Sequence, residues 1–214
     1  MSDTSDKTTR KRLTSEERRE AFITQAIAYF AEEGFEGSTR ELARRLGVTQ
    51  PLLYRYFPSK DDLVGEVYER VFINRWNDAW GDLLRDRSRP VRDRLIDFYH
   101  AYTDVVFSRE WMRIFLFSGL KGVGINRRYI ALVHGRILDP IVRECRHEAG
   151  LEERAPTEAE IEVALTMHGG IFYYGVRSVI YEAPKIKDKS FVISSTIDIY
   201  LEALKRDWAA VSPE

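Results

Sequence analysis

Hydrophobic residues recur every three or four positions along most of the chain, with polar residues between them. The first stripe runs through Ile23, Ile27 and Phe30 and ends at Gly34, a common stop signal for a helix. Later stripes cover 64–83, 91–105, 130–141, 161–179 and 197–208, the first of them in one helix that begins at Ser59 and continues toward Pro90. The alternation typical of strands is scarce. The pattern predicts an all-α protein of about nine helices in connected bundles.

Residues 1–14 (MSDTSDKTTRKRLT) lack this periodicity and are polar, which predicts a flexible arm. The arm carries a basic cluster, Lys7, Arg10, Lys11 and Arg12. Two interpretations of the cluster remain open: it reaches into a DNA minor groove, or it is a solvated segment without a partner.

Two short helices are predicted between residues 38 and 57. Ser38, followed three residues later by Glu41, has the pattern of a capping box, and the helix it starts ends before Gly47. Thr49 is the predicted cap of the next helix, and Pro51 lies in the first turn, where a missing N–H costs no helical bond. A longer helix before this pair completes the three-helix arrangement of a helix-turn-helix unit.

The helix pair has one apolar side and one side rich in rings and hydrogen-bond donors. The apolar side, expected to face inward, comprises Leu42, Ala43, Leu46, Val48, Leu53 and Phe57. The side expected to face outward or along the rim comprises Gln50, Pro51, Leu52, Tyr54, Arg55 and Tyr56. Arg44 and Arg45 are expected on a solvated helix face, with a smaller chance of contacting phosphate.

The outward residue types suit the major groove of DNA. A glutamine such as Gln50 can pair with adenine through two hydrogen bonds, and an arginine, here Arg40 or Arg55, can do so with guanine. Pro51 offers an apolar surface for a thymine methyl group. The residues with the reach for phosphates are Tyr54, Tyr56 and Lys60, the last at a predicted helix N-terminus.

The segment GFEGSTRELARRLGVTQPLLYRYFPSK resembles the N-terminal signature of the tetracycline-repressor (TetR) family, and the likeness extends over residues 15–65. The resemblance implies a symmetric dimer whose variable C-terminal region binds a small effector. By position it implies base contacts from Arg40, Gln50 and Pro51, and it also implies a set of phosphate contacts: Thr49, Tyr54 and Lys60. The predicted organisation is therefore a flexible arm (1–14), a DNA-binding domain (15–62) and a ligand-binding and dimerisation domain (63–214).

Charge and cysteine content indicate where a DNA-binding surface can lie and in which compartment the protein works. Lys and Arg total 33 against 34 Asp and Glu, so any DNA-binding surface has to be local rather than a field of the whole protein. Cys145 is the single cysteine, which excludes an internal disulfide and suits a reducing cytosol. The longest apolar runs are far shorter than a membrane span, so we expect a cytoplasmic protein.

No motif for catalysis is present: the sequence has no HExxH, no glycine-rich phosphate loop and no GxSxG, and we expect no enzyme activity, metal or cofactor. His134 and His168 each interrupt an apolar stripe. Each is either a hydrogen-bonded core histidine or a polar anchor in a ligand pocket, and the sequence leaves both open. The candidate pocket residues are Phe98, Tyr102, Trp111, Phe115, His134, Met167, His168 and Phe172.

These patterns favour a homodimeric regulator, most simply a repressor that a small hydrophobic or aromatic effector releases from a palindromic operator. Gly169, Gly170 and Gly175 weaken a helix interior unless something approaches closely, and helices near the C-terminus from two subunits could form a four-helix interface. The alternative is a helical small-molecule-binding or enzymatic protein whose DNA-binding head is vestigial.

Overall fold

The computed structural model describes residues 13–209. Its helices are α1 (Ser15–Glu33), α2 (Thr39–Arg45), α3 (Gln50–Tyr56), α4 (Lys60–Tyr68), α5 (Ala79–Arg85), α6 (Val91–Val106), α7 (Arg109–Lys121), α8 (Ile125–Val133), α9 (Asp139–Glu148), α10 (Glu158–Gly175) and α11 (Lys189–Ala209). Three π-helical turns extend them: η1 (Glu69–Ile73), η2 (His134–Leu138) and η3 (Val176–Ile180). The described residues form no strand, and the predicted all-α class is confirmed. The predicted arm lies almost wholly outside the described residues.

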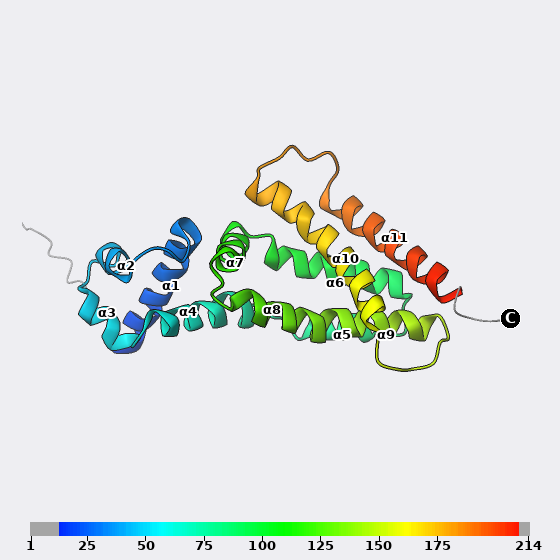
Figure 1. Ribbon diagram of the computed structural model, residues 1–214, viewed down its shortest axis with the longest axis horizontal. Helices are drawn as coiled ribbons and strands as arrows, with labels where there is room; N and C mark the ends of the chain where they lie inside the picture. The colour runs from blue at the N-terminus through cyan, green and yellow to red at the C-terminus, as the bar shows by residue number, and fades with distance from the viewer. Residues whose placement is uncertain (1–12, 210–214) are drawn as a thin grey trace, which may run out of the picture.

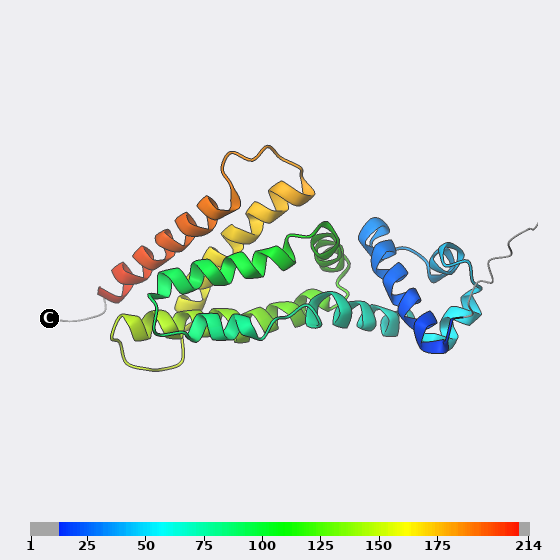
Figure 2. The ribbon, with the colours of Figure 1, turned by 180° about the vertical axis from the view of Figure 1, so that it is seen from behind.

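The molecule is elongated, with a small head at one end. Helices α1, α2 and α3 form the head, and α4 leads from it into a larger helical body (Figures 1 and 2). Helices α10 and α11 lie side by side and form an outer layer of the body (Figures 1 and 2). The predicted boundary at residues 62 and 63 falls within α4, so the helix itself connects the head to the body.

Helix α1 begins and ends as its sequence dictates. Thr14 and Glu17 form a complete capping box, and Gly34 ends the helix at a φ of 72°, a conformation that favours glycine. The expected capping box of α2 forms only in part. Ser38 accepts a hydrogen bond from the Glu41 N–H, but the Glu41 carboxylate binds Arg44 instead of returning to the cap.

The single helix predicted from Ser59 toward Pro90 is wrong. After α4 the chain passes through η1, turns at residues 74–78 and restarts as α5, where the Asn77 side chain accepts a hydrogen bond from the Ala79 N–H. A π-helical turn adds a residue to the turn and so shifts the apolar register. Because of this shift and the turn, Leu84 rather than Leu83 is buried on α5.

The bend expected at Pro140 takes the form of η2. Proline lacks an N–H and its ring crowds the carbonyl four residues earlier, and the π-helical turn just before it accommodates both effects. The predicted stripe through Ile130, His134, Ile137 and Ile141 holds only in its second half. Ile137 and Ile141 are buried, but Ile130 and His134 are exposed, and Tyr129 and Val133 are buried in their place. This places Ile130 and His134 at the rim of the cavity described below.

The expected close approach at a glycine of α10 occurs at Gly175. A Cβ there would lie 2.3 Å from the ring of Phe107, so no larger residue fits without displacing that ring. Gly169 differs, because a Cβ there would have nothing within 4 Å. Gly169 therefore leaves an open space beside the helix, whereas Gly175 allows a close contact.

A buried ion pair that the hydrophobic pattern did not predict joins α6 to α9. Arg94, 1% exposed, donates to a Glu144 carboxylate oxygen at 2.8 Å and to the Leu84 carbonyl at 2.5 Å. Burial raises the pKa of Glu144, but hydrogen bonds from Arg87 and Arg94 outweigh it and hold that pKa below its ordinary value. The pair fixes the corner where α5, α6 and α9 meet.

Candidate DNA-binding face and effector cavity

In the head, the apolar side of the helix pair faces inward and the polar, aromatic side faces outward, as predicted. Four of the six inward residues, Leu42, Ala43, Leu53 and Phe57, are at most 2% exposed, and the other two are partly buried against them. On the opposite side Pro51, Tyr54 and Arg55 are exposed, while Gln50, Leu52 and Tyr56 are half-buried. Helix α3 therefore presents an outer side rich in rings and donors.

The arginines of the head fall into two groups. Arg44 and Arg45 are held by carboxylates: Arg44 by Glu41, and Arg45 by two glutamates at the end of α1. Arg40 and Arg55 are exposed and make no ion pair or hydrogen bond with any other described residue. The two arginines predicted to read bases are thus the ones left available, and the two expected on a solvated face are already paired.

Thr39, a residue that the sequence did not single out, joins two of the predicted DNA contacts. It is the first residue of α2 and is 9% exposed. Its Oγ1 accepts a hydrogen bond from Gln50 Nε2 at 2.8 Å and lies 3.0 Å from the Tyr54 hydroxyl, with which it shares a second hydrogen bond. The only sequence signal was a hydroxyl residue beside Arg40 at the start of a helix.

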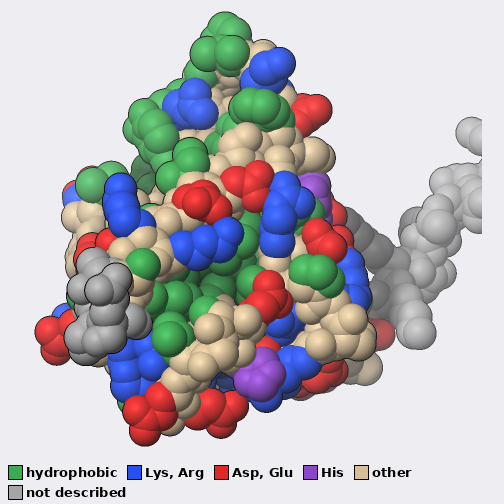
Figure 3. Space-filling view, turned by 90° about the vertical axis from the view of Figure 1, so that its right-hand side faces the viewer, with side chains coloured by type: hydrophobic (Ala, Val, Ile, Leu, Met, Phe, Trp, Pro, Cys, Tyr) green, Lys and Arg blue, Asp and Glu red, His purple; other side chains and the backbone are tan. Residues whose placement is uncertain are grey.

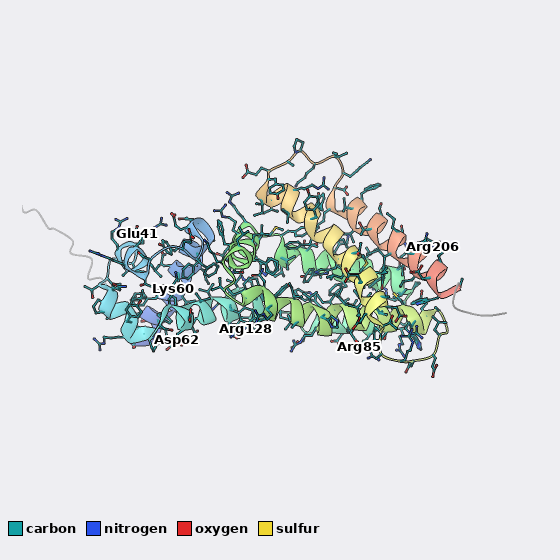
Figure 4. The ribbon with its side chains drawn as sticks, in the orientation of Figure 1. Glu41, Lys60, Asp62, Arg85, Arg128 and Arg206 are labelled. Atoms are coloured by element: carbon teal, nitrogen blue, oxygen red, sulfur yellow. The ribbon has the colours of Figure 1, made fainter. Side chains whose placement is uncertain are left out.

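Lys60 differs from its predicted environment. Its Nζ donates to the carbonyls of Phe35 at 2.5 Å and Gly37 at 3.0 Å, so the side chain ties α4 to the loop between α1 and α2. Figure 4 marks Lys60 and Asp62 at the start of α4, next to the head. Asp61 and Asp62 occupy the first turn of α4, and their charges oppose an anion there. Lys60 thus lies at the helix N-terminus as predicted, but its ammonium group is already bonded to two carbonyls, and the predicted phosphate contact stays a prediction.

Two further predicted contacts are placed less simply. Thr49 occupies the cap position of α3 and is exposed, but its side chain makes no capping hydrogen bond. The Tyr56 ring packs edge-on against Phe22 with centroids 5.2 Å apart, so this ring belongs to the core of the head. A phosphate contact from Tyr56 would have to come from its hydroxyl alone.

The body contains a cavity of about 200 Å³ between α6, α7, α8 with η2, and α10. It is lined by Tyr102, Trp111, Phe115, Tyr129, Ile130, Val133, His134, Leu138, Leu165, His168, Gly169 and Phe172. Six of the eight predicted pocket residues are among them. Phe98 and Met167, at 0% and 3% exposure, are packed in the core away from this cavity, so the structure does not place these two predicted residues at it.

Aromatic rings form most of the cavity wall. Trp111 and Phe115, one turn apart on α7, stack with centroids 5.1 Å apart, and Tyr129 meets Trp111 edge-on at 5.0 Å. Phe172 of α10 faces Phe115 at 5.6 Å. The helical pattern did not single out Tyr129, Leu165 and the other aliphatic lining residues, although Tyr129 lies on α8, which leads into His134.

The polar groups buried in the cavity wall are few and uncharged. Burial lowers the pKa of His168 to about 4, so its imidazole is neutral near pH 7, and its Nδ1 lies 3.2 Å from the Tyr99 hydroxyl. The hydroxyls of Tyr102 and Tyr129 bind each other at 2.8 Å, and burial raises the pKa of both. No lining residue is Asp, Glu, Lys or Arg. The cavity therefore suits an uncharged molecule.

The structure places the two histidines differently. His168 is buried and hydrogen-bonded like a core histidine, and its ring also lines the cavity, so both interpretations of His168 stay open. His134 is exposed at the rim, so the core interpretation of His134 is wrong.

A second hollow lies at the end of the body opposite the head. Hydrophobic side chains form its floor and charged side chains surround it (Figure 3). Its lining includes Arg146, Arg154 and Glu160, which form two ion pairs at 2.8 Å. Although burial raises the pKa of Glu160, hydrogen bonds from Arg154, the Thr157 backbone, Arg146 and Trp208 lower it to about 2. This charged cluster closes the corner between α9, α10 and α11.

Within residues 13–209, no three side chains of His, Cys, Asp or Glu gather as a metal site would require. In the same part of the chain, every helix is too short or too polar to cross a bilayer.

Comparison with known proteins gives a consistent result. A family model described as bacterial regulatory proteins, tetR family, matches residues 22–67. The HTH-type transcriptional regulator HbdR of Aromatoleum sp. (strain CIB) is 26% identical over 136 residues, 61% of this chain and 58% of that protein. The tetracycline repressor protein class C of Escherichia coli is 37% identical over 94 residues, 40% of this chain and 41% of the repressor. The chain thus spans about half the length of the curated relatives it matches.

The likeness to solved structures extends over nearly the whole chain. A TetR family transcriptional regulator from Pseudomonas syringae pv. tomato str. DC3000 matches with a TM-score of 0.60 at 19% identity, covering 89% of this chain and 97% of that one. A TetR-like transcriptional regulator from Rhodococcus sp. RHA1 matches with a TM-score of 0.60 at 16% identity, covering 92% and 99%. The proteins matched here are described as regulators and not as enzymes, and the body shares their fold.

Proposed function

We propose that this chain, which belongs to the TetR family of bacterial transcriptional regulators, is a cytoplasmic homodimeric repressor that a small hydrophobic or aromatic effector releases from a palindromic DNA operator. Two features of the structure carry the proposal. The two head arginines without a partner in the described chain, Arg40 and Arg55, lie in the helix pair that also presents Gln50 and Tyr54, and a largely aromatic cavity lies in the body. The first feature suits DNA and the second a ligand.

Readout of DNA is assigned to the outer side of α3 and the start of α2. Arg40 and Gln50 contact base edges, Pro51 contacts a thymine methyl group, and Thr49 and Tyr54 contact phosphates. Arg55 and Tyr56 are assigned to the rim of the same surface.

The dimer is assigned to α10 and α11. Tyr173, Phe191 and Ile199 are 53%, 51% and 71% exposed on these two neighbouring helices, and Phe191 and Ile199 lie two turns apart on one stripe of α11. A second copy packed on this layer would bury them in a four-helix interface. The two recognition helices then enter successive major grooves about 34–36 Å apart.

The effector is assigned to the cavity, and its chemistry follows from the lining. An aromatic wall without a charged residue favours a neutral aromatic molecule over an anion, because a buried carboxylate would find no cation there. His168 and the tyrosine hydroxyls supply the few hydrogen bonds that orient it.

Two connections run from the cavity to the head. The first is α4 with η1: Phe72 of η1 packs against Trp111 at 5.0 Å and Tyr129 at 5.4 Å, and Lys60 at the other end of the same helix holds the α1–α2 loop. The second is α7, whose Arg113 donates to the carbonyls of Ala31 and Glu32 at the end of α1. A ligand that displaces the aromatic wall therefore acts on both supports of the head.

Release then follows from differential binding. In one state of the dimer the two heads are too far apart or too close to reach both half-sites of the operator. For about every 1.4 kcal/mol by which the ligand binds this state better than the DNA-binding state, operator affinity falls tenfold.

The decisive experiment measures binding of the purified protein to DNA from its own upstream region, by gel shift and fluorescence anisotropy over a range of salt concentrations. We expect sequence-preferring, salt-sensitive binding that 2-naphthol weakens and 2-naphthoate, its charged counterpart, does not. Arg40→Ala should cost about 1–3 kcal/mol and relax base preference. Arg44→Ala, in which the lost arginine is already paired with Glu41, is the matched control and should keep the preference.

Absence of any sequence preference in the wild-type protein would contradict the proposal. Turnover of a small molecule without DNA binding would support the alternative of a helical enzyme or binding protein with a vestigial head.

A further inference from the structure

The hydroxyl of Thr39 lies where the two helices of the head meet. It bonds Gln50, the first residue of α3, and Tyr54, one turn later on the same helix. A threonine hydroxyl has one donor and two acceptor positions, so it can serve both partners at once. These two hydrogen bonds form a relay through Thr39. Thr39 is buried, at 9% exposure, whereas Tyr54 lies at the surface, at 38% exposure.

The bond to Thr39 restricts the amide of Gln50. A glutamine side chain rotates about three bonds, and its amide can face a base with either the oxygen or the nitrogen leading. Pairing with adenine uses the amide oxygen and one N–H, which leaves the other N–H for a different acceptor. In this protein that acceptor is present before DNA arrives, at 2.8 Å.

The neighbouring arginines have no such support. Arg40 and Arg55 make no hydrogen bond or ion pair with any other residue in the described range, so their orientation is set only on binding. Gln50 and Tyr54 are the DNA-facing side chains that another residue of the head already orients. Preorientation of this kind strengthens binding and sharpens discrimination, because less freedom is lost when the contact forms.

We propose that Thr39 is a positioning residue for base readout: its hydroxyl orients the Gln50 amide and the Tyr54 hydroxyl, and thereby sets the base preference at the position that Gln50 reads. This inference rests on the proposed function, since it assumes that the outer side of α3 meets DNA. Thr39 acts through its neighbours and does not itself need to touch a base.

The test compares Thr39→Val, which keeps the shape and removes the hydroxyl, with Thr39→Ser, which keeps the hydroxyl. Duplexes selected by the wild-type protein from a random library are varied one base pair at a time, and binding is measured by fluorescence anisotropy. The position read by Gln50 is the one at which Gln50→Ala loses preference. We expect Thr39→Val to reduce discrimination at that position by about tenfold, and Thr39→Ser to retain it.

A double variant and an NMR comparison separate positioning from a merely structural role. In a Gln50→Ala background, Thr39→Val should cause no additional loss of discrimination at that position, because the amide that Thr39 orients is no longer there. The Gln50 side-chain amide signals in an NMR spectrum of the full chain should shift in Thr39→Val and stay in place in Thr39→Ser.

Uniform weakening by Thr39→Val at every base pair, or unchanged Gln50 amide signals, would overturn the role of Thr39 while leaving the proposed function intact. A wild-type protein that selects no sequence would overturn the proposed function and this readout role together, and the NMR comparison would still report whether the relay exists.

Discussion

His168 makes the stability of this protein depend on pH between about 4 and 6.5. Burial lowers its pKa from 6.5 to about 4, so the folded protein keeps the imidazole neutral at pH values where the unfolded chain binds a proton. The unfolded state therefore gains protons first as the pH falls, and stability is lost from pH 6.5 downward until the folded form also protonates near pH 4. The difference corresponds to roughly 3 kcal/mol, or roughly 6–12 °C in Tm for a chain of this length.

The perturbation that isolates this effect is His168→Gln, which does not titrate and can still bond the Tyr99 hydroxyl. Urea unfolding is followed by tryptophan fluorescence at about pH 7.5 and about pH 4.5, at one protein concentration because the proposed dimer would make stability depend on concentration. We expect the wild type to lose roughly 2.5 kcal/mol more than the variant between the two conditions, most of the full difference, because a pH of about 4.5 still lies above the folded-state pKa of about 4. Carboxylates titrate alike in both proteins, and His134→Gln, at an exposed histidine, should follow the wild type.

Equal losses in the wild type and in His168→Gln would refute the reasoning, because they would mean that the buried imidazole protonates in the folded protein as readily as in the unfolded chain.

Two other substitutions test the cavity and the head. Gly169→Leu should fill the open side of the cavity and abolish the response to 2-naphthol while DNA binding persists, whereas Gly169→Ala, with nothing within 4 Å of the new Cβ, should keep the response and raise helix stability by up to about 1 kcal/mol in thermal unfolding. Lys60→Met should destabilise the protein by about 1–2 kcal/mol in urea unfolding, because two carbonyls lose their donor. If Lys60 also contacts phosphate, the variant lowers the salt slope of DNA binding by about 1, whereas an unchanged slope would restrict Lys60 to its structural bonds.

The outward side of α3 could be predicted because it depends on local rules. Helical period, the glycine before Val48 and the proline in the first turn fix which residues face inward, and Leu53 and Phe57 are buried as expected. Lys60 could not be predicted, because its carbonyl partner Phe35 lies 25 residues earlier and only the folded head brings them together. Thr39 was missed for the same reason, since its partners belong to another helix.

The residues that line the cavity could not be fully predicted either, because they too depend on contacts between distant segments. Phe98 and Tyr102 are one turn apart on α6 and equally apolar in pattern, yet only Tyr102 reaches the cavity while Phe98 is enclosed by other side chains. Helical spacing identifies the buried side of a helix, but which buried residue borders a space depends on how neighbouring helices pack. The π-helical turn at His134 adds to this, because it rotates the residues after it relative to an ideal helix.

The two supports of the head act on one short segment. Arg113 of α7 binds the carbonyls of Ala31 and Glu32, and Lys60 of α4 binds those of Phe35 and Gly37. Any movement of α7 relative to α4 must therefore deform residues 31–37.

Residues two apart on a helix face nearly opposite sides, so Trp111 can line the cavity while Arg113 holds the head. Displacement of Trp111 by a ligand moves Arg113 with it, because α7 is continuous from Arg109 to Lys121. The segment that receives this movement leads directly into α2, where Thr39 and Arg40 begin the surface that we propose to face DNA. On this reasoning a ligand changes the orientation of the base-reading residues as well as the distance between two heads, and Arg113→Met should weaken the first effect without altering the cavity.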